Sequence, residues 1–323
     1  MRAESLRVGI RQAGTTLAHT ARRRLYSLTA HSRLAERVAR FGYGAFGPTR
    51  DLFQEVLLQT HNQCNYACSF CPNRDVDRPR HQMPEALFDR IIDNLARLGY
   101  EGTVLLNMQN EPLMDDRLFS FIDTARARLP RARLLLNTNT SLLTTTKLKR
   151  LAGAGVRCVL NLYREGDRRD FSLADLPSRL RRHVVVCDKT RWSAATSHLL
   201  NWAGNASEMP VPPSPLKEFC PRPFTMLCIT SHGRALLCCL DWRSECIMGD
   251  VTEESLEDIW AGERFQAIRR KLLDGDRSDA LCSRCNKGWS PMPWRLLWRR
   301  ASACLSRPRS QRNPGLVRGA WQE

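Results

Sequence analysis

Apolar and polar residues follow two different periods along the middle of the chain. Short apolar runs of the kind found in buried strands occur at 52–59, 103–108, 132–139, 156–163 and 183–188. Between them, apolar residues recur on one face of a predicted helix at 83–99, 115–129 and 144–153. Strand–helix units that repeat every 25–30 residues or so predict an α/β fold with a parallel sheet, open or closed into a barrel.

The pattern changes after residue 205, where a Pro-rich stretch at 205–223 predicts a linker into a second, smaller domain. Residues 225–242 predict a β-hairpin that turns at His232 and Gly233, and residues 255–275 predict one amphipathic helix. We therefore expect four parts: a basic helical extension at 1–50, a barrel domain at 51–205, an auxiliary domain at 206–290 and a basic, Trp-containing tail at 291–323.

The composition makes the chain strongly positively charged. The 323 residues carry a formal net charge of +17 and are 42% hydrophobic, enough for a large domain with a sizeable core and a smaller one. Such charge suits nucleic acid or an acidic membrane, but no nucleic-acid-binding motif is present, so we expect no nucleic-acid partner. Contact of the tail tryptophans with a membrane surface is the weaker alternative to their capping the auxiliary domain.

The chain shows neither a signal peptide nor a run of about 18 apolar residues, which predicts a cytoplasmic protein.

Thirteen cysteines in such a chain favour metal binding over disulfides. Three of them, Cys64, Cys68 and Cys71, stand in HNQCNYACSFCPNR directly after the first predicted strand. This places them at the carboxyl end of the sheet, where α/β proteins bind ligands. Three thiolates do not complete a tetrahedral structural zinc site. In a 4Fe–4S cluster they leave one iron open to a further ligand.

The spacing Cys64-x3-Cys68-x2-Cys71, with an aromatic residue before the last cysteine, resembles the radical S-adenosylmethionine (radical SAM) superfamily. That resemblance implies a partial (β/α)6 barrel whose open iron is chelated by the amino and carboxylate groups of S-adenosylmethionine. One electron from the cluster then cleaves the sulfonium bond, and the 5′-deoxyadenosyl radical abstracts a hydrogen atom from the substrate. The resemblance further implies a flavodoxin or a ferredoxin as the electron donor.

Three other segments match family motifs. QNEP at 109–112 occupies the place of the family's GGEP, which holds the methionine amino group, although the glycines are missing. NTN at 137–139 stands where the family often has TNG near the ribose, and NWAGN at 201–205 resembles the segment that closes the barrel. The cofactor-binding residues implied are Phe70 (against the adenine), Asn110, Glu111 and Asn139. From the residues alone, Glu111 also fits a position beside a helix N-cap, and Asn139 a turn.

A second cysteine set follows the predicted linker: Cys220, Cys238, Cys282 and Cys285. A hairpin and a loop after a helix can bring four thiolates to one cluster with no open iron. The pattern around them resembles the SPASM/twitch auxiliary domain of radical SAM enzymes, which implies one auxiliary 4Fe–4S cluster. A structural zinc is the rival interpretation, and Cys239 could replace its neighbour Cys238 as a ligand.

The resemblance says less about the reaction than about the cofactors. We expect a small sugar-, aminocyclitol- or nucleoside-like substrate from natural-product (antibiotic) biosynthesis, with oxidation of an alcohol carbon as the favoured outcome because the auxiliary cluster can accept the electron. Epimerisation with Cys246 as hydrogen donor, decarboxylation, and maturation of a ribosomal peptide are the alternatives within the family. A non-catalytic Fe–S or zinc protein is the alternative outside it. Cys158 and Cys187 are predicted to be packing residues within strands.

Overall fold

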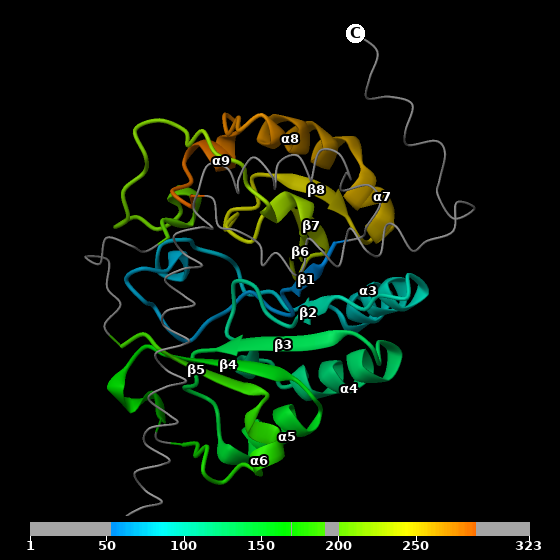
Figure 1. Ribbon diagram of the computed structural model, residues 1–323, viewed down its shortest axis with the longest axis vertical. Helices are drawn as coiled ribbons and strands as arrows, with labels where there is room; N and C mark the ends of the chain where they lie inside the picture. Colours follow the sequence, from blue (N-terminus) through cyan, green and yellow to red (C-terminus); the bar gives the residue numbers. More distant parts are fainter. Residues whose placement is uncertain (1–52, 169, 191–199, 289–323) are drawn as a thin grey trace, which may run out of the picture. The chain divides into compact units, whose positions relative to one another are not determined.

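The computed structural model describes residues 53–168, 170–190 and 200–288. The predictions for the basic extension at 1–50 and the tail at 291–323 lie outside these residues. Within them the chain forms one sheet in the order β5-β4-β3-β2-β1-β6-β7-β8 (Figure 1). The strands are β1 (Glu55–Leu58), β2 (Thr103–Leu105), β3 (Arg133–Thr138), β4 (Arg157–Leu162), β5 (Val184–Asp188), β6 (Met226–Ile229), β7 (Arg234–Leu236) and β8 (Ile247–Asp250).

The first six strands are parallel, as the strand–helix pattern predicts. Glu55 of β1 pairs with Thr103 of β2 on one side and with Met226 of β6 on the other. The predicted second domain therefore adds its first strand directly to the edge of the barrel sheet, and β7 and β8 continue that edge in antiparallel fashion. This shared sheet ties the two cysteine-bearing halves of the chain to one framework.

The helices lie beside the strands that they connect. They are α3 (Glu85–Arg97), α4 (Leu118–Arg128), α5 (Thr145–Gly153), α6 (Ser178–Arg181), α7 (Leu256–Ala261), α8 (Glu263–Leu273) and α9 (Ala280–Ser283). In Figure 1, α3 to α6 follow the strands β1 to β5, whereas α7 to α9 accompany β6 to β8. Short 3-10 helices stand in the loops at Pro72–Arg74 (η1), Pro112–Met114 (η2), Glu165–Arg168 (η3), Trp202–Gly204 (η4) and Arg222–Phe224 (η5).

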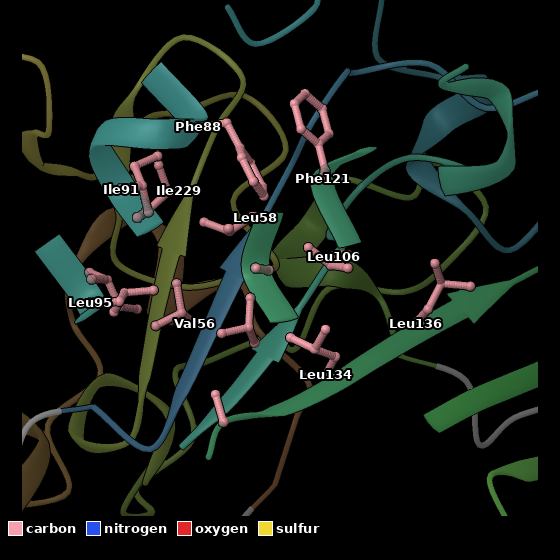
Figure 2. Close-up of a cluster of buried hydrophobic side chains, with 14 of the residues drawn as sticks. Val56, Leu58, Phe88, Ile91, Leu95, Leu106, Phe121, Leu134, Leu136 and Ile229 are labelled. Atoms are coloured by element: carbon pink, nitrogen blue, oxygen red, sulfur yellow. The ribbon is translucent and has the colours of Figure 1, made fainter. Parts of the chain in front are cut away.

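The core forms between the parallel strands and α3. Because its apolar residues recur at i, i+4 and i+7, one face of α3 buries Phe88, Ile91 and Leu95 completely or nearly so. Figure 2 shows these side chains in one cluster with Val56 and Leu58 of β1. Truncation of such a residue to alanine typically costs about 2–5 kcal/mol, so this cluster anchors β1 and the loop that follows it.

The prediction of a single helix at 255–275 is wrong at one point. Gly262 has an extended backbone (φ −64°, ψ 155°), and it separates α7 from α8. A Cβ at this position would stand 3.0 Å from the Asp258 carbonyl oxygen, which explains why the break falls on glycine. The sequence pattern also gave no sign of β8, whose short segment pairs with β7.

Candidate active site

The three-cysteine loop leaves the carboxyl end of β1 and is fixed to the end of β2. The ring of His61 donates from Nε2 to the Glu111 carbonyl oxygen at 3.0 Å, and the Glu111 N–H donates to the Gln63 carbonyl oxygen at 3.0 Å. Cys64, Cys68 and Cys71 are half-buried and line one cavity of about 380 Å³. The structure therefore brings the three predicted cluster ligands to one site at the strand ends.

Burial governs the acidity of these thiols. It raises the pKa of Cys68 to about 11 and that of Cys71 to about 12, and it also raises the pKa of Cys64. At neutral pH the thiols are therefore protonated until a metal displaces the protons. The donor set, three thiols that face a roomy cavity, fits a cluster with one iron left open.

Glu111 lines the same cavity, yet the residue is only 2% exposed and its carboxylate is held by the protein. Its Oε1 accepts from the Thr138 hydroxyl at 2.7 Å and from the Leu113 N–H at 3.1 Å, and its Oε2 accepts from the Asn139 N–H at 2.7 Å. Burial raises its pKa. A carboxylate offers about four acceptor sites, so one remains for an ammonium group. Glu111 thus joins the ends of β2 and β3, and its contact with the methionine amino group stays a prediction.

Asn110 gives the clearest sign that the cavity receives a polar ligand. Its Oδ1 accepts from the Met108 N–H at 3.1 Å, whereas its buried Nδ2 has no hydrogen-bond partner among the described residues. An unpaired buried donor costs free energy, and an acceptor such as the carboxylate of S-adenosylmethionine would satisfy it.

The other two predicted cofactor residues also line this cavity. The ring of Phe70 packs on Tyr163 with ring centroids 5.4 Å apart, and its carbonyl oxygen accepts from Trp202 Nε1 at 2.9 Å. The amide of Asn139 donates to Asn65 Oδ1 at 2.9 Å and reaches Cys64 Sγ at 3.7 Å. Asn139 therefore holds the cysteine loop against the end of β3, and its predicted contact with the ribose stays a prediction.

Gln109 is a residue whose role sequence reasoning missed. It stands where the family motif has glycine, and its Nε2 donates to the carbonyl oxygens of Cys239 at 3.1 Å and Asp241 at 2.9 Å. Its own carbonyl and side-chain oxygens accept from Arg78. The replacement of the motif's glycine by glutamine was the sequence signal that could have indicated this role. The longer side chain reaches from the first cysteine site to the second half of the chain.

The second predicted set also comes together. Cys220, Cys238, Cys282 and Cys285 line a separate small cavity, with Arg222, Arg277 and Lys287 among its walls. Arg222 Nη1 lies 3.8 Å from Cys238 Sγ, and the Lys287 N–H points to Cys285 Sγ at 3.3 Å. Four thiols and surrounding donors fit a closed cluster.

Two rival assignments at this cavity can be compared with the geometry. Cys239 is not part of the lining of the cavity; it packs with Cys228 against Leu57 and Leu236. This favours Cys238 as the ligand. Within the described residues no group of three or more His, Cys, Asp or Glu side chains is placed to hold a single metal ion.

Among the remaining cysteines, one differs from the sequence predictions. Cys158 is fully buried, as predicted for a packing residue. The prediction for Cys187 is wrong, since it is half-buried at the end of β5 and lines the first cavity. Cys246 lines neither cavity, and its N–H donates to Asp241 Oδ2 at 2.8 Å; its role as a hydrogen donor stays a prediction.

Comparison with known families agrees with this geometry. The model of the radical SAM superfamily matches residues 58–166, and the model of the SPASM iron–sulfur cluster-binding domain matches residues 220–286. The chain is a radical SAM enzyme with a SPASM domain, and these domains imply 4Fe–4S clusters and S-adenosylmethionine. The predicted fold class, a partial barrel followed by an auxiliary cluster domain, is confirmed.

One relative is the S-adenosyl-L-methionine-dependent 2-deoxy-scyllo-inosamine dehydrogenase of Niallia circulans, which is 27% identical over 73% of this chain and 93% of the relative. The crystal structure of BtrN in complex with AdoMet and 2-DOIA matches with a TM-score of 0.64 and 25% identity, over 73% of this chain and 94% of that one. BtrN in an open conformation matches with a TM-score of 0.57 and 24% identity, over 74% and 94%. The predicted resemblance to the radical SAM superfamily and to its SPASM domain is thereby confirmed. No helix among the described residues is both long and apolar enough to cross a membrane.

Proposed function

We propose that this enzyme oxidises an alcohol carbon of a small sugar-, aminocyclitol- or nucleoside-like molecule to a ketone in natural-product biosynthesis. The bound cofactors supply a 5′-deoxyadenosyl radical and an electron acceptor. The substrate then loses a hydrogen atom from carbon, a proton from its hydroxyl group and one electron. The dehydrogenase relative supports this proposal, since its name describes an oxidation of the same kind.

The arrangement that carries the proposal is the short wall between the two cavities. Trp202 lines the first cavity, and its neighbour Ala203 lines the second. Trp242 also lines the first cavity, and its ring meets that of Trp202 edge-on with centroids 5.9 Å apart. The second cavity, with four thiols and little free space, suits electron storage rather than substrate binding. Its position next to the first supports a role as electron acceptor.

The residues of this chain have separate tasks in that reaction. Asn110 offers its unpaired donor to the cofactor carboxylate, and Glu111 offers its remaining acceptor site to the cofactor amino group. The rings of Phe70, Tyr163 and Trp202 limit access of water to the cavity. A flavodoxin or a ferredoxin in the cytoplasm supplies the first electron.

The test begins with anaerobic reconstitution and a count of iron and sulfide. We expect about eight irons, two clusters of four. The triple variant Cys64→Ala, Cys68→Ala and Cys71→Ala should lose four of them and form no 5′-deoxyadenosine with S-adenosylmethionine and dithionite. Cys158→Ala, which changes a buried cysteine outside both cavities, is the matched control and should retain all of them. Bound zinc, or an intact cluster that never cleaves S-adenosylmethionine, would contradict the proposal.

Epimerisation is a second candidate, and the position of Cys187 favours it. Its thiol lines the first cavity, so it could give a hydrogen atom to a substrate carbon radical. The resulting thiyl radical would return to the thiol with one electron from the auxiliary cluster, when that cluster is bound, and one proton from water. In deuterated water such a product would carry deuterium at carbon, and Cys187→Ala would abolish this incorporation. A ketone product with no deuterium incorporation would exclude epimerisation.

A further inference from the structure

Hydrogen bonds through one side chain join the two cysteine sites. Gln109, in the loop after β2, lines the first cavity, and its Nε2 donates to the carbonyl oxygens of Cys239 at 3.1 Å and Asp241 at 2.9 Å. Cys239 directly follows Cys238, a predicted ligand that lines the second cavity. Gln109 therefore holds the Cys238 turn, residues 238–241, against the wall of the first cavity.

Arg78 extends this link to the three-cysteine loop. Its Nη1 donates to Gln109 Oε1 at 3.2 Å, and its Nη2 donates to the Gln109 carbonyl oxygen at 3.1 Å. Nη2 also donates at 3.2 Å to Oδ1 of Asn73, which stands two residues after Cys71. The guanidinium carbon lies 4.6 Å from the centroid of the Trp242 ring. Arg78 thus fixes the position of Gln109 from the side of the first cysteine site.

The Leu240 carbonyl group completes the attachment of the Cys238 turn. It lies between the two carbonyl groups that Gln109 binds, and its oxygen accepts from Asn205 Nδ2 at 3.1 Å. Gln109, Leu240 and Asp241 are all buried, and a buried acceptor without a partner costs free energy. Removal of the Gln109 amide should therefore displace or loosen this turn.

We propose that Gln109 and Arg78 are positioning residues for electron transfer, because they fix the Cys238 turn at one distance from the first cavity. In the proposed function, on which this inference rests, the substrate radical is oxidised by one electron and its hydroxyl proton passes to water. The auxiliary cluster, when bound at Cys238, is reduced by that electron. The rate of such a transfer falls steeply with distance, so a displaced turn would slow it. The glycine of the family motif has no side chain with which to make this link.

The test measures the distance between the two clusters in the reconstituted holoenzyme. Both clusters are reduced with dithionite, and dipolar pulsed electron paramagnetic resonance gives the distribution of the distance between their spins. We expect one narrow distribution for the wild type. Gln109→Met keeps the length of the side chain without its donor. It should broaden the distribution or shift its centre by about 0.5–1 Å, the difference between a hydrogen bond and a van der Waals contact.

Two further variants show whether the link is the cause. Gln82→Met, at an exposed position outside both cavities, is the matched control and should leave the distribution unchanged. Arg78→Met removes the support of Gln109 but not its donor, so it should broaden the distribution less. It takes the place of Gln109→Met if that variant holds fewer than about eight irons.

Three results would overturn the inference: a broad distribution in the wild type, an unchanged one in both Gln109→Met and Arg78→Met, or an equal change in Gln82→Met. Failure of the proposed function has a different signature, because a wild type that holds both clusters would then form no 5′-deoxyadenosine.

Discussion

Arg222 is expected to set how readily the auxiliary cluster accepts an electron. Its Nη1 lies 3.8 Å from Cys238 Sγ, and Arg277 and Lys287 line the same cavity, in which no acidic side chain takes part among the described residues. Each added electron makes the cluster more negative, so nearby cations stabilise the reduced form. Replacement of Arg222 by glutamine should therefore lower the reduction potential.

The magnitude follows from the distance. Two unit charges 3.8 Å apart attract each other by about 4 kcal/mol at an effective dielectric constant of about 20. The added electron spreads over the whole cluster, so we take about half of this attraction energy, about 2 kcal/mol. For one electron, this energy corresponds to a decrease of ~90 mV in the reduction potential of Arg222→Gln. Arg222→Lys retains the charge and should lose only a minor part of this effect.

The assay is a redox titration followed by electron paramagnetic resonance. It uses the Cys64→Ala, Cys68→Ala and Cys71→Ala background, in which only the auxiliary cluster remains. Arg234→Gln, at an exposed position on β7, serves as the control for a general change in net charge. Equal potentials for Arg222→Gln, Arg222→Lys and the control would refute the reasoning, because the argument depends on a local charge.

Three further predictions concern ligand choice, the cavity wall and pH. Cys238→Ser should lose about four irons and Cys239→Ser none, and an iron count with the reverse result would show that Cys239 is the ligand. The fully buried Asn201 donates its amide to two backbone carbonyl oxygens; Asn201→Asp should therefore cost about 3 kcal/mol in urea unfolding, and an unchanged midpoint would contradict it. The rings of His81 and His232 stack 3.5 Å apart, and the pKa of His232 is lowered by burial and then by His81. Because the folded state resists protonation, stability falls as the pH drops through the ordinary imidazole pKa of 6.5. His232→Gln should flatten this fall in Tm, and parallel pH curves of the variant and the wild type would argue against it.

Local patterns predicted most of the framework correctly. The apolar positions of α3 repeat at the spacing of one helix face, and the structure buries that face against β1. The break at Gly262 could not be predicted in this way, because it depends on how close a Cβ would come to a backbone oxygen in the folded chain. β8 was missed for a related reason, since its short segment has little alternation of its own and pairs with β7.

In the site, too, the sequence predicts the features that depend on neighbouring residues and not those that depend on strand pairing. The spacing of Cys64, Cys68 and Cys71 is a local signal, and the structure brings these residues to one cavity. The cavity residues Cys187 and Lys189 are recognisable only once β5 is placed beside β4, because strand register decides which side chains at a strand end reach the cavity. No spacing in the sequence links them to the cysteines.

The wall between the two cavities is held in a conformation that local preference opposes. Trp202 and Ala203 both have positive φ, 53° and 55°, in the left-handed region that costs an L-residue roughly 1–2 kcal/mol. Asn201 offsets this cost, because its Oδ1 accepts from the Ala203 N–H at 3.0 Å, and Asn205 donates to the Trp202 carbonyl oxygen at 2.8 Å. The strained turn makes Trp202 part of the first cavity and Ala203 part of the second. A less strained turn would not divide the two side chains in this way, so the asparagines of the NWAGN segment act as positioning residues for both sites.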